Sequence, residues 1–167
     1  MVFKSSLDKT SKAITIGVIL LLLVVLLFIS YPFSGNENLT TSLLIGLLFL
    51  VIIIVTYAFS TKSIEVDKSN LSINRPFDKV VLLRSDIIKI EKIEYKDLSL
   101  AMRKFGSGGV FGYIGKFWNK QQGNMTWYAT DMKNPVMIET KNGKKIVLTP
   151  DDRDQFLEQF TIIEKTI

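Results

Sequence analysis

Residues 14–29 read ITIGVILLLLVVLLFI, and no charged residue occurs from Ala13 to Asn36. A helix rises about 1.5 Å per residue, so about 20 apolar residues cross the roughly 30 Å hydrocarbon core of a bilayer. Residues 42–59 read SLLIGLLFLVIIIVTYAF and are also free of charge. The two stretches therefore predict a transmembrane helical hairpin within residues 13–61.

The segment that joins the two stretches is short and polar. Residues 32–41 read PFSGNENLTT, and their Pro, Gly, Ser and Asn predict a turn. This turn contains Glu37 but no Lys or Arg, whereas lysines flank the hairpin at its other end. Because basic residues stay on the cytoplasmic side, we expect a multi-pass protein of the cell (inner, cytoplasmic) membrane, with both termini cytoplasmic and residues 1–12 as a tail. The flanking lysines are Lys4, Lys9, Lys12, Lys62 and Lys68.

The composition narrows the chemistry that the chain can carry. Its 167 residues include no Cys and no His. Disulfides, thiolate nucleophiles and sulfur-based zinc sites are thereby excluded, and the usual general base near neutral pH is missing. Cytoplasmic lysines explain the net charge of +5, so we expect no nucleic-acid binding. We also expect no enzymatic activity, no cofactor and no metal site.

From Lys62 onward the chain changes to short runs that alternate apolar and polar residues, as strands do. Two of these runs flank Asn142-Gly143, the strongest short-range pattern for a β-hairpin. Ile90 and Ile93 are out of phase, which predicts a bulge between them. The expected strands are residues 63–67, 71–75, 79–84, 87–95, 126–130, 136–140 and 145–149.

The last part of the chain has the pattern of a helix. Thr149 and Asp152 have the spacing of a capping box, and Pro150 suits a first helical turn. An apolar stripe at helical spacing follows, which predicts an amphipathic helix that covers one open end of a small antiparallel barrel. The stripe consists of Phe156, Leu157, Phe160 and Ile163.

Three strings add a family resemblance: FGSGGVFGY at residues 105–113, TWYATD at 126–131 and TPDD at 149–152. With them, residues 62–160 resemble the bacterial PH-like (pleckstrin-homology-like) domain proteins that carry N-terminal transmembrane spans. The resemblance implies that residues 62–167 form a PH-like, seven-stranded antiparallel barrel or sandwich capped by a C-terminal α-helix. It also implies a non-enzymatic, membrane-associated role. Phosphoinositide-binding PH domains carry several basic residues around their first hairpin, where this chain has Lys68 alone, so inositol-phosphate binding is not expected.

One segment, residues 103–119, reads RKFGSGGVFGYIGKFWN, and we call it the glycine-aromatic segment. Its spacing does not match a phosphate-binding loop, since Phe111 stands where GxGxxG needs its third glycine. It suits a membrane-facing loop, because aromatic rings and basic side chains favour the head-group zone. It equally suits a bulged loop whose rings fill a barrel mouth. If the segment faces the membrane, the candidate membrane- or partner-contacting residues are Arg103, Lys104, Phe105, Phe111, Tyr113, Lys116, Phe117, Trp118 and Lys120.

Together these features predict a non-catalytic, membrane-anchored PH-like module that binds a protein partner or lipid head groups at the cytoplasmic membrane face. The alternative is a regulatory or assembly subunit of a larger membrane complex, with the helical hairpin as its interface. The expected partners are the lipid bilayer, anionic lipid head groups and a protein that the sequence does not identify, a second copy of the chain being one alternative.

Overall fold

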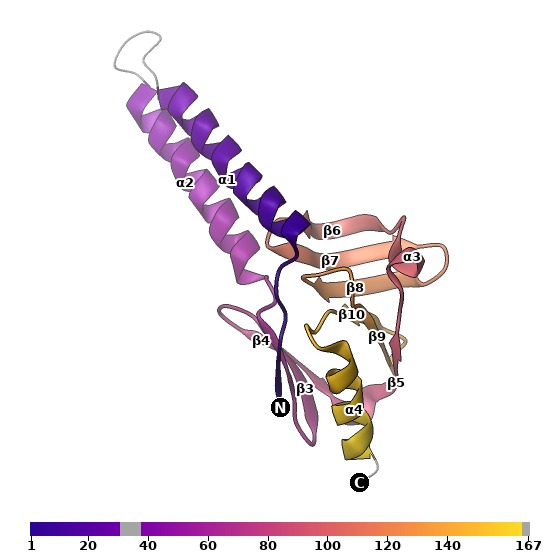
Figure 1. Cartoon of the computed structure of the whole chain (residues 1–167). Coiled ribbons are helices and arrows are strands. Elements are labelled where there is room, and N and C mark those ends of the chain that lie inside the picture. Colours follow the sequence, from indigo (N-terminus) through magenta and orange to yellow (C-terminus); the bar gives the residue numbers. More distant parts are fainter. Residues whose placement is uncertain (31–37, 165–167) are drawn as a thin grey trace.

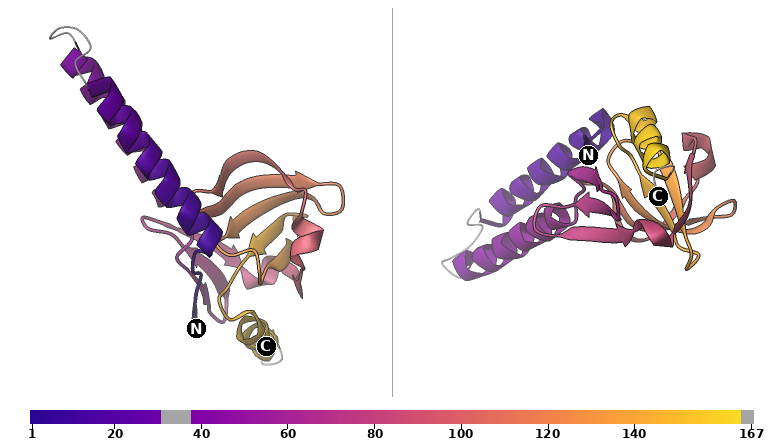
Figure 2. Two further views of the ribbon diagram at one scale, coloured as in Figure 1. Left: turned by 45° about the horizontal axis from the view of Figure 1, so that its top comes forward. Right: turned by 90° about the horizontal axis from the view of Figure 1, so that it is seen from below.

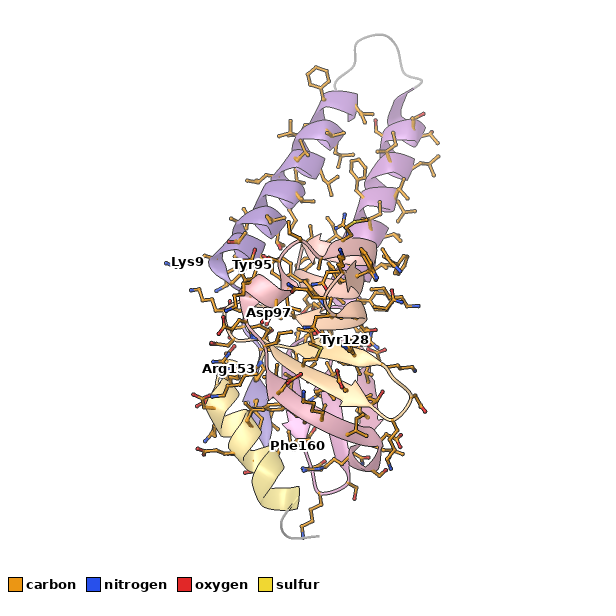
Figure 3. All side chains as sticks on the ribbon, turned by 90° about the vertical axis from the view of Figure 1, so that its right-hand side faces the viewer. Lys9, Tyr95, Asp97, Tyr128, Arg153 and Phe160 are labelled. Carbon is orange, nitrogen blue, oxygen red and sulfur yellow. The ribbon has the colours of Figure 1, made fainter. Side chains whose placement is uncertain are left out.

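The computed structural model describes residues 1–30 and 38–164 of the chain (Figure 1). Two helices, α1 (Lys9–Ser30) and α2 (Asn38–Ala58), lie side by side and project from a β-rich body (Figure 2). Only 6% of each apolar window is buried inside the chain, and Figure 3 shows side chains projecting from these helices above the body. A core helix of a soluble protein would be mostly buried, so these are two candidate membrane-spanning helices, consistent with a membrane protein. Of the predicted turn, residues 32–37 lie outside the described residues, and residues 38–41 already belong to α2.

The strands that flank the two helices in sequence pair with each other. β1 precedes α1, β2 follows α2, and the two run antiparallel with Phe3 opposite Ile64. The helical hairpin therefore takes the place that a tight turn has in an ordinary β-hairpin. The sheet is antiparallel in the order β1-β2-β3-β4. Its strands are β1 (Val2–Lys4), β2 (Ser63–Val66), β3 (Asn70–Asn74) and β4 (Lys79–Leu83).

A second sheet has six strands in the order β5-β9-β10-β8-β7-β6. β8 and β10 run parallel, whereas the other neighbours run antiparallel. The prediction of seven antiparallel strands within residues 62–167 is therefore wrong in number and in this one pair, because the described part of that range contains nine strands, β2 to β10. The strands are β5 (Ile87–Lys92), β6 (Met102–Gly109), β7 (Gly112–Asn119), β8 (Gly123–Ala129), β9 (Val136–Thr140) and β10 (Lys145–Leu148).

Two short helical turns flank β5, namely η1 (Arg84–Asp86) and α3 (Tyr95–Leu98). The predicted strand at residues 87–95 ends early because Asp97 and Glu94 form a capping box that starts α3. The register shift also lies between residues 87 and 89, and not between residues 90 and 93 as predicted.

The hydrophobic core has two parts, one on each face of the six-stranded sheet. The first fills the space between the two sheets and contacts the C-terminal helix α4 (Arg153–Glu164). The second lies on the other face, beneath Leu98 of α3, and includes side chains of β7, β8, β9 and β10. The largest fully buried side chains between the sheets are Ile64, Leu71, Ile73, Ile138, Leu148 and Phe156.

The C-terminal helix forms as predicted, but its cap differs from the prediction. The Asp152 carboxylate accepts the N–H of Gln155 at 3.0 Å, so Asp152 is the capping residue and α4 begins at Arg153. The Thr149 hydroxyl instead accepts the N–H of Thr130 at 2.8 Å and is buried. Phe156 and Phe160 of the predicted stripe are buried, whereas the side chain of Ile163 lies outside the described ones.

The N-terminal segment is built into the body, which the sequence did not predict. Phe3 is 4% exposed and meets Phe156 edge to face, with ring centroids 5.4 Å apart. The main-chain amines and carbonyls of residues 1 and 66 also pair across β1 and β2. A buried aromatic ring so close to the chain end holds the start of α1 on the domain.

Hydrogen bonds continue this attachment up to the first turn of α1. The Ser5 hydroxyl donates to the carbonyl oxygen of Thr149 at 2.9 Å. Ser6 donates its N–H and its hydroxyl to the two carboxylate oxygens of Asp151, at 2.7 and 2.6 Å. On the other side, Lys62 N–H donates to Asn74 O at 2.9 Å soon after α2 ends. Both helices are thus joined to the body through short, hydrogen-bonded segments.

Candidate functional site

The glycine-aromatic segment is a β-hairpin, β6 and β7, and its tip lies against both membrane-spanning candidates (Figure 1). The N–H of Phe111 at the tip donates to the Thr15 hydroxyl of α1 at 2.9 Å. The Phe111 ring meets Tyr57 of α2 edge to face, with centroids 5.4 Å apart. Both interpretations expected a loop, whereas the segment is a pair of strands that forms an ordered contact between the sheet and the base of the helices.

Two glycines permit the two strands of this hairpin to approach each other closely. Gly106 and Gly115 stand opposite each other, with φ of 107° and 127°. A Cβ on Gly106 would lie 2.0 Å from the Ile114 carbonyl oxygen, and one on Gly115 would lie 2.2 Å from the Phe105 carbonyl oxygen. Any other residue would both strain the backbone and clash, so the glycines are required by the close approach of the two strands.

β6 is an edge strand of the six-stranded sheet, and three of the expected contact residues lie exposed on it. Phe105 is 77% exposed, and Arg103 and Lys104 precede it. The register shifts between Arg103 and Phe105, so Lys104 forms a bulge, and its ammonium donates to the Asn124 side chain at 2.7 Å. This edge carries a large aromatic ring beside two cations next to the base of the helices.

The expected contact residues on β7 divide between the interior and the surface. Phe117 is 4% exposed and stacks on Trp127 with ring centroids 4.0 Å apart, so this ring belongs to the core and not to a contact surface. Phe117 therefore points inward, into the part of the core beneath α3 and not into the space between the two sheets. Lys116 and Trp118 point to the exposed face. Lys120 is exposed in the β7–β8 turn, at the end of the strands far from the helices (Figure 1).

Tyr113 lies half-buried next to the start of α1. Its hydroxyl is 3.5 Å from the Asp8 carboxylate, and Asp8 also caps α1 by accepting the N–H of Ser11 at 2.6 Å. Burial raises the pKa of Tyr113 above its usual value of 10.0, and the nearby Asp8 charge acts in the same direction. Tyr113 therefore stays a neutral hydrogen-bonding group at physiological pH.

The predicted contact residues leave out further aromatic residues around the base of α2. Phe77, in the β3–β4 turn, is 71% exposed and approaches Tyr57 at 6.4 Å. Phe59 is 51% exposed, and the Arg75 guanidinium lies 5.4 Å from its ring centroid. An aromatic residue in a turn rich in Pro and Asp is unusual, and that was the signal that could have identified Phe77.

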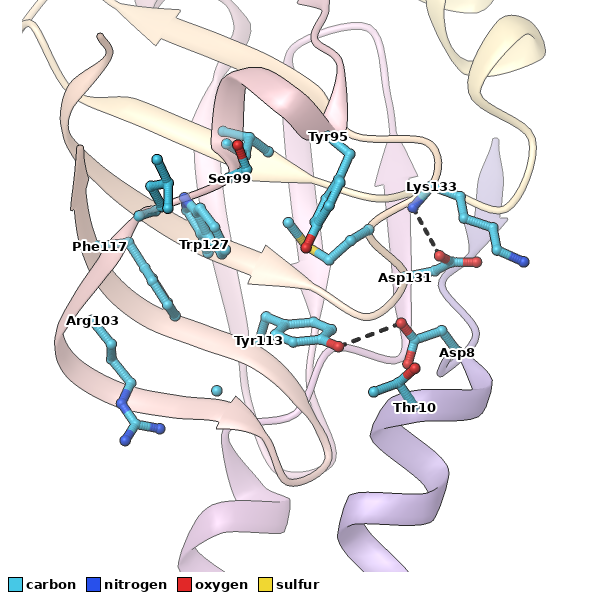
Figure 4. Close-up of a pocket in the computed structure, with 15 residues that line it drawn as sticks. Asp8, Thr10, Tyr95, Ser99, Arg103, Tyr113, Phe117, Trp127, Asp131 and Lys133 are labelled. Carbon is cyan, nitrogen blue, oxygen red and sulfur yellow. Dashed lines mark hydrogen bonds between the residues drawn. The ribbon is translucent and has the colours of Figure 1, made fainter. Parts of the chain in front are cut away.

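Two cavities adjoin the hairpin. The first, of about 720 Å³, lies between the start of α1, α3 and the strands β6 to β8 (Figure 4). The second, of about 500 Å³, lies between the β6–β7 hairpin and the two helices. Arg103 lines both of them. Among the described residues no three His, Cys, Asp or Glu side chains come together, so no metal ligands can be named.

Comparison with known proteins gives one result for this chain. Residues 62–162 match the family model described as Bacterial PH domain. The comparisons with curated proteins and with solved structures find no match. The matched range begins directly after α2, so it includes β2 to β10 and leaves out β1 and the two helices.

Proposed function

Because the chain belongs to the bacterial PH domain family and carries two candidate spans before that domain, we propose that it is a non-catalytic, membrane-anchored module that binds lipid head groups. The supporting observation is the collection of exposed rings and cations at the base of the helices. Aromatic rings favour the membrane interface, and Lys and Arg are attracted to anionic lipids. These residues are Phe59, Phe77, Phe105, Lys62, Arg103 and Lys104.

The expected strength of this contact is modest for each residue. A basic residue near an anionic surface contributes about 1 kcal/mol. The spans keep the domain permanently beside the lipid, so docking is intramolecular and needs no free-solution affinity. A few cations and rings are then enough to hold the domain in one orientation on the bilayer.

The side of the membrane forms part of the proposal. Lysines precede the first span and follow the second, and the joining segment has none. This distribution favours a domain on the cytoplasmic side of the cell membrane. A thiol-reactive reagent that cannot cross membranes tests this with Lys141→Cys, since the chain has no Cys of its own. We expect labelling in inverted vesicles and none in intact cells; the reverse pattern contradicts the orientation.

The docking itself is tested with full-length protein in lipid nanodiscs. A polarity-sensitive fluorophore on Phe105→Cys should report an apolar environment when the nanodisc contains anionic lipid. Arg103→Gln with Lys104→Gln should weaken the shift, and so should added salt, because both reduce the attraction to the surface. The matched control is Lys141→Gln with Lys144→Gln, in the exposed β9–β10 turn.

The outcome that rejects lipid docking is equally direct. A fluorophore at residue 105 that reports water in every lipid, and that ignores salt and both pairs of substitutions, leaves the rings without a lipid partner.

The alternative is a subunit of a larger membrane complex that uses the helical hairpin as its interface. It is favoured by an apolar groove of about 570 Å³ between α1 and α2. Gly46 lines this groove, and a Cβ there would lie 3.3 Å from the Leu26 side chain. A partner protein that co-purifies with the parent chain in mild detergent but not with Gly46→Leu supports this alternative. Equal recovery of the partner with the parent chain and with the variant argues against it.

A further inference from the structure

The first cavity, which we call the head-group pocket, has the size and lining of a ligand site. Its volume of about 720 Å³ is within the range of small-molecule pockets. It lies beside Asp8 and Thr10, just before α1 becomes continuously apolar at Ala13. Four aromatic rings line it: Tyr95, Tyr113, Phe117 and Trp127.

One wall of the head-group pocket carries an unsatisfied polar atom. Trp127 is 4% exposed, and its Nε1–H has no hydrogen-bond partner among the described residues. A buried donor without an acceptor is costly, because it has lost water and gained nothing in exchange. A ligand that brings an acceptor oxygen into this pocket would satisfy it.

Opposite charges occupy opposite sides of the pocket. Figure 4 shows Asp8 and Asp131 on one side and Arg103 on the other, with the aromatic rings between them. The Lys133 side chain extends away from the rings on the acidic side. Carboxylates and ring faces attract an ammonium group, and a guanidinium binds phosphate. This arrangement fits a zwitterion that carries an ammonium and a phosphate.

Arg103 lines both this pocket and the second cavity, which we call the acyl groove. The acyl groove is lined by apolar side chains of both candidate spans and by Phe105 and Phe111 of the hairpin. Segments that cross a bilayer are surrounded by lipid, so the chemistry that fits these walls is a hydrocarbon chain. The α-helical contributions come from Val18, Ile19, Leu22, Ile52, Ile53 and Val55.

We propose that the chain binds one phospholipid with an ammonium head group at the base of α1. The ammonium lies between the rings and Asp8, the phosphate lies on Arg103, and an acyl chain fills the acyl groove. The proposal rests on the proposed function only in placing the domain at the bilayer surface. It specifies a pocket-bound lipid, which the surface attraction of exposed cations does not require.

The test uses full-length protein reconstituted with equal parts of phosphatidylethanolamine and phosphatidylglycerol. After extraction in mild detergent, native mass spectrometry counts the lipids retained by each chain. We expect one retained phosphatidylethanolamine. Asp8→Asn should reduce this retention about tenfold, the factor that corresponds to about 1.4 kcal/mol. Asn also caps helices, so this variant removes the charge and keeps the start of α1.

Two further variants separate the parts of the site. Arg103→Gln should reduce the retention of both lipids, because both carry a phosphate. Lys144→Gln removes the same charge from the exposed β9–β10 turn, outside the pocket, and should leave retention unchanged. Tyr113→Phe should also weaken phosphatidylethanolamine retention without changing the melting temperature. This second variant keeps the test decisive if Asp8→Asn fails to fold.

Soluble phosphoethanolamine distinguishes the lipid from the free group. Displacement of the lipid by it shows that the ammonium and phosphate suffice, and failure to displace shows that the acyl chain is needed; both support the site. Equal retention of the two phospholipids, or no effect of Asp8→Asn, overturns it. In that case, an apolar signal from Phe105→Cys would leave surface docking intact, so the two proposals can fail separately.

Discussion

Phe3 stands three residues from the N-terminus and yet is 4% exposed, between β2 and α4. Val2 beside it is 60% exposed, as the alternation of a strand requires. Asp8, five residues later, caps α1 and approaches Tyr113. Individual side chains in this short segment therefore determine how the first span meets the domain.

Phe3→Ala should lower the free energy of unfolding by about 3–5 kcal/mol, the usual cost of emptying a buried aromatic site. Chemical unfolding of the full-length protein in detergent measures it. Val2→Ala serves as the control and should change stability little, because its side chain is exposed. Equal stability of Phe3→Ala and the parent protein would show that the N-terminal segment is not part of the core.

Tyr113 should make stability depend on alkaline pH. Burial raises its pKa above 10.0 in the folded protein, so the folded state prefers the neutral phenol. This contribution is complete below the unfolded pKa and decreases as the pH rises above about 10. Melting temperatures between about pH 8 and pH 11 should fall less steeply for Tyr113→Phe than for the parent.

Tyr128 provides a comparison, because burial also raises its pKa and Arg75 opposes the rise. Tyr128→Phe should flatten the same alkaline decrease in part. Identical pH profiles for the parent and both variants would contradict the burial of these hydroxyls.

At the scale of elements, the spans, the alternating strands and the C-terminal helix could be predicted from local pattern. β6 and β7 could not, because several of their glycines adopt positive φ and because Gly106 and Gly115 approach closely only once the strands have paired. β1 has only three residues, and its partner β2 follows after both helices. The parallel pairing of β8 with β10 is also set by distant packing.

The candidate contact residues follow the same division. Their aromatic and basic character was visible in the sequence, but the direction of each side chain was not. Phe117 on β7 faces the core and Phe105 on β6 faces outward, and the bulge at Lys104 shifts the register between these two strands. The register of β6 against β7 cannot be predicted from local composition alone.

Gly106→Ala should destabilise the β6–β7 hairpin strongly. The new Cβ would lie 2.0 Å from a backbone oxygen, and positive φ adds strain of about 1–3 kcal/mol. Gly123→Ala is the control, since Gly123 also has positive φ but nothing lies within 4 Å of its Cβ position. Hydrogen exchange should accelerate in β6 and β7 for the first variant far more than for the second; equal rates would contradict the close approach.

At the scale of the whole molecule, the helical hairpin is inserted between two paired strands of one sheet. β1 ends just before α1, and β2 begins just after α2, so the domain is attached to the spans on both sides. Ser6 and Asp151 add a second connection next to α1. A domain tethered by one linker would tumble, whereas this double attachment holds one face of the domain at the base of the helices.

The distance between spin labels on Val24→Cys in α1 and Lys141→Cys in the β9–β10 turn tests this double attachment most directly. Both positions are exposed, and the chain has no other Cys. In nanodiscs, pulsed electron paramagnetic resonance should give a single narrow distance distribution. A broad distribution would mean that the domain moves freely relative to its spans, and the fixed membrane-facing surface would be contradicted.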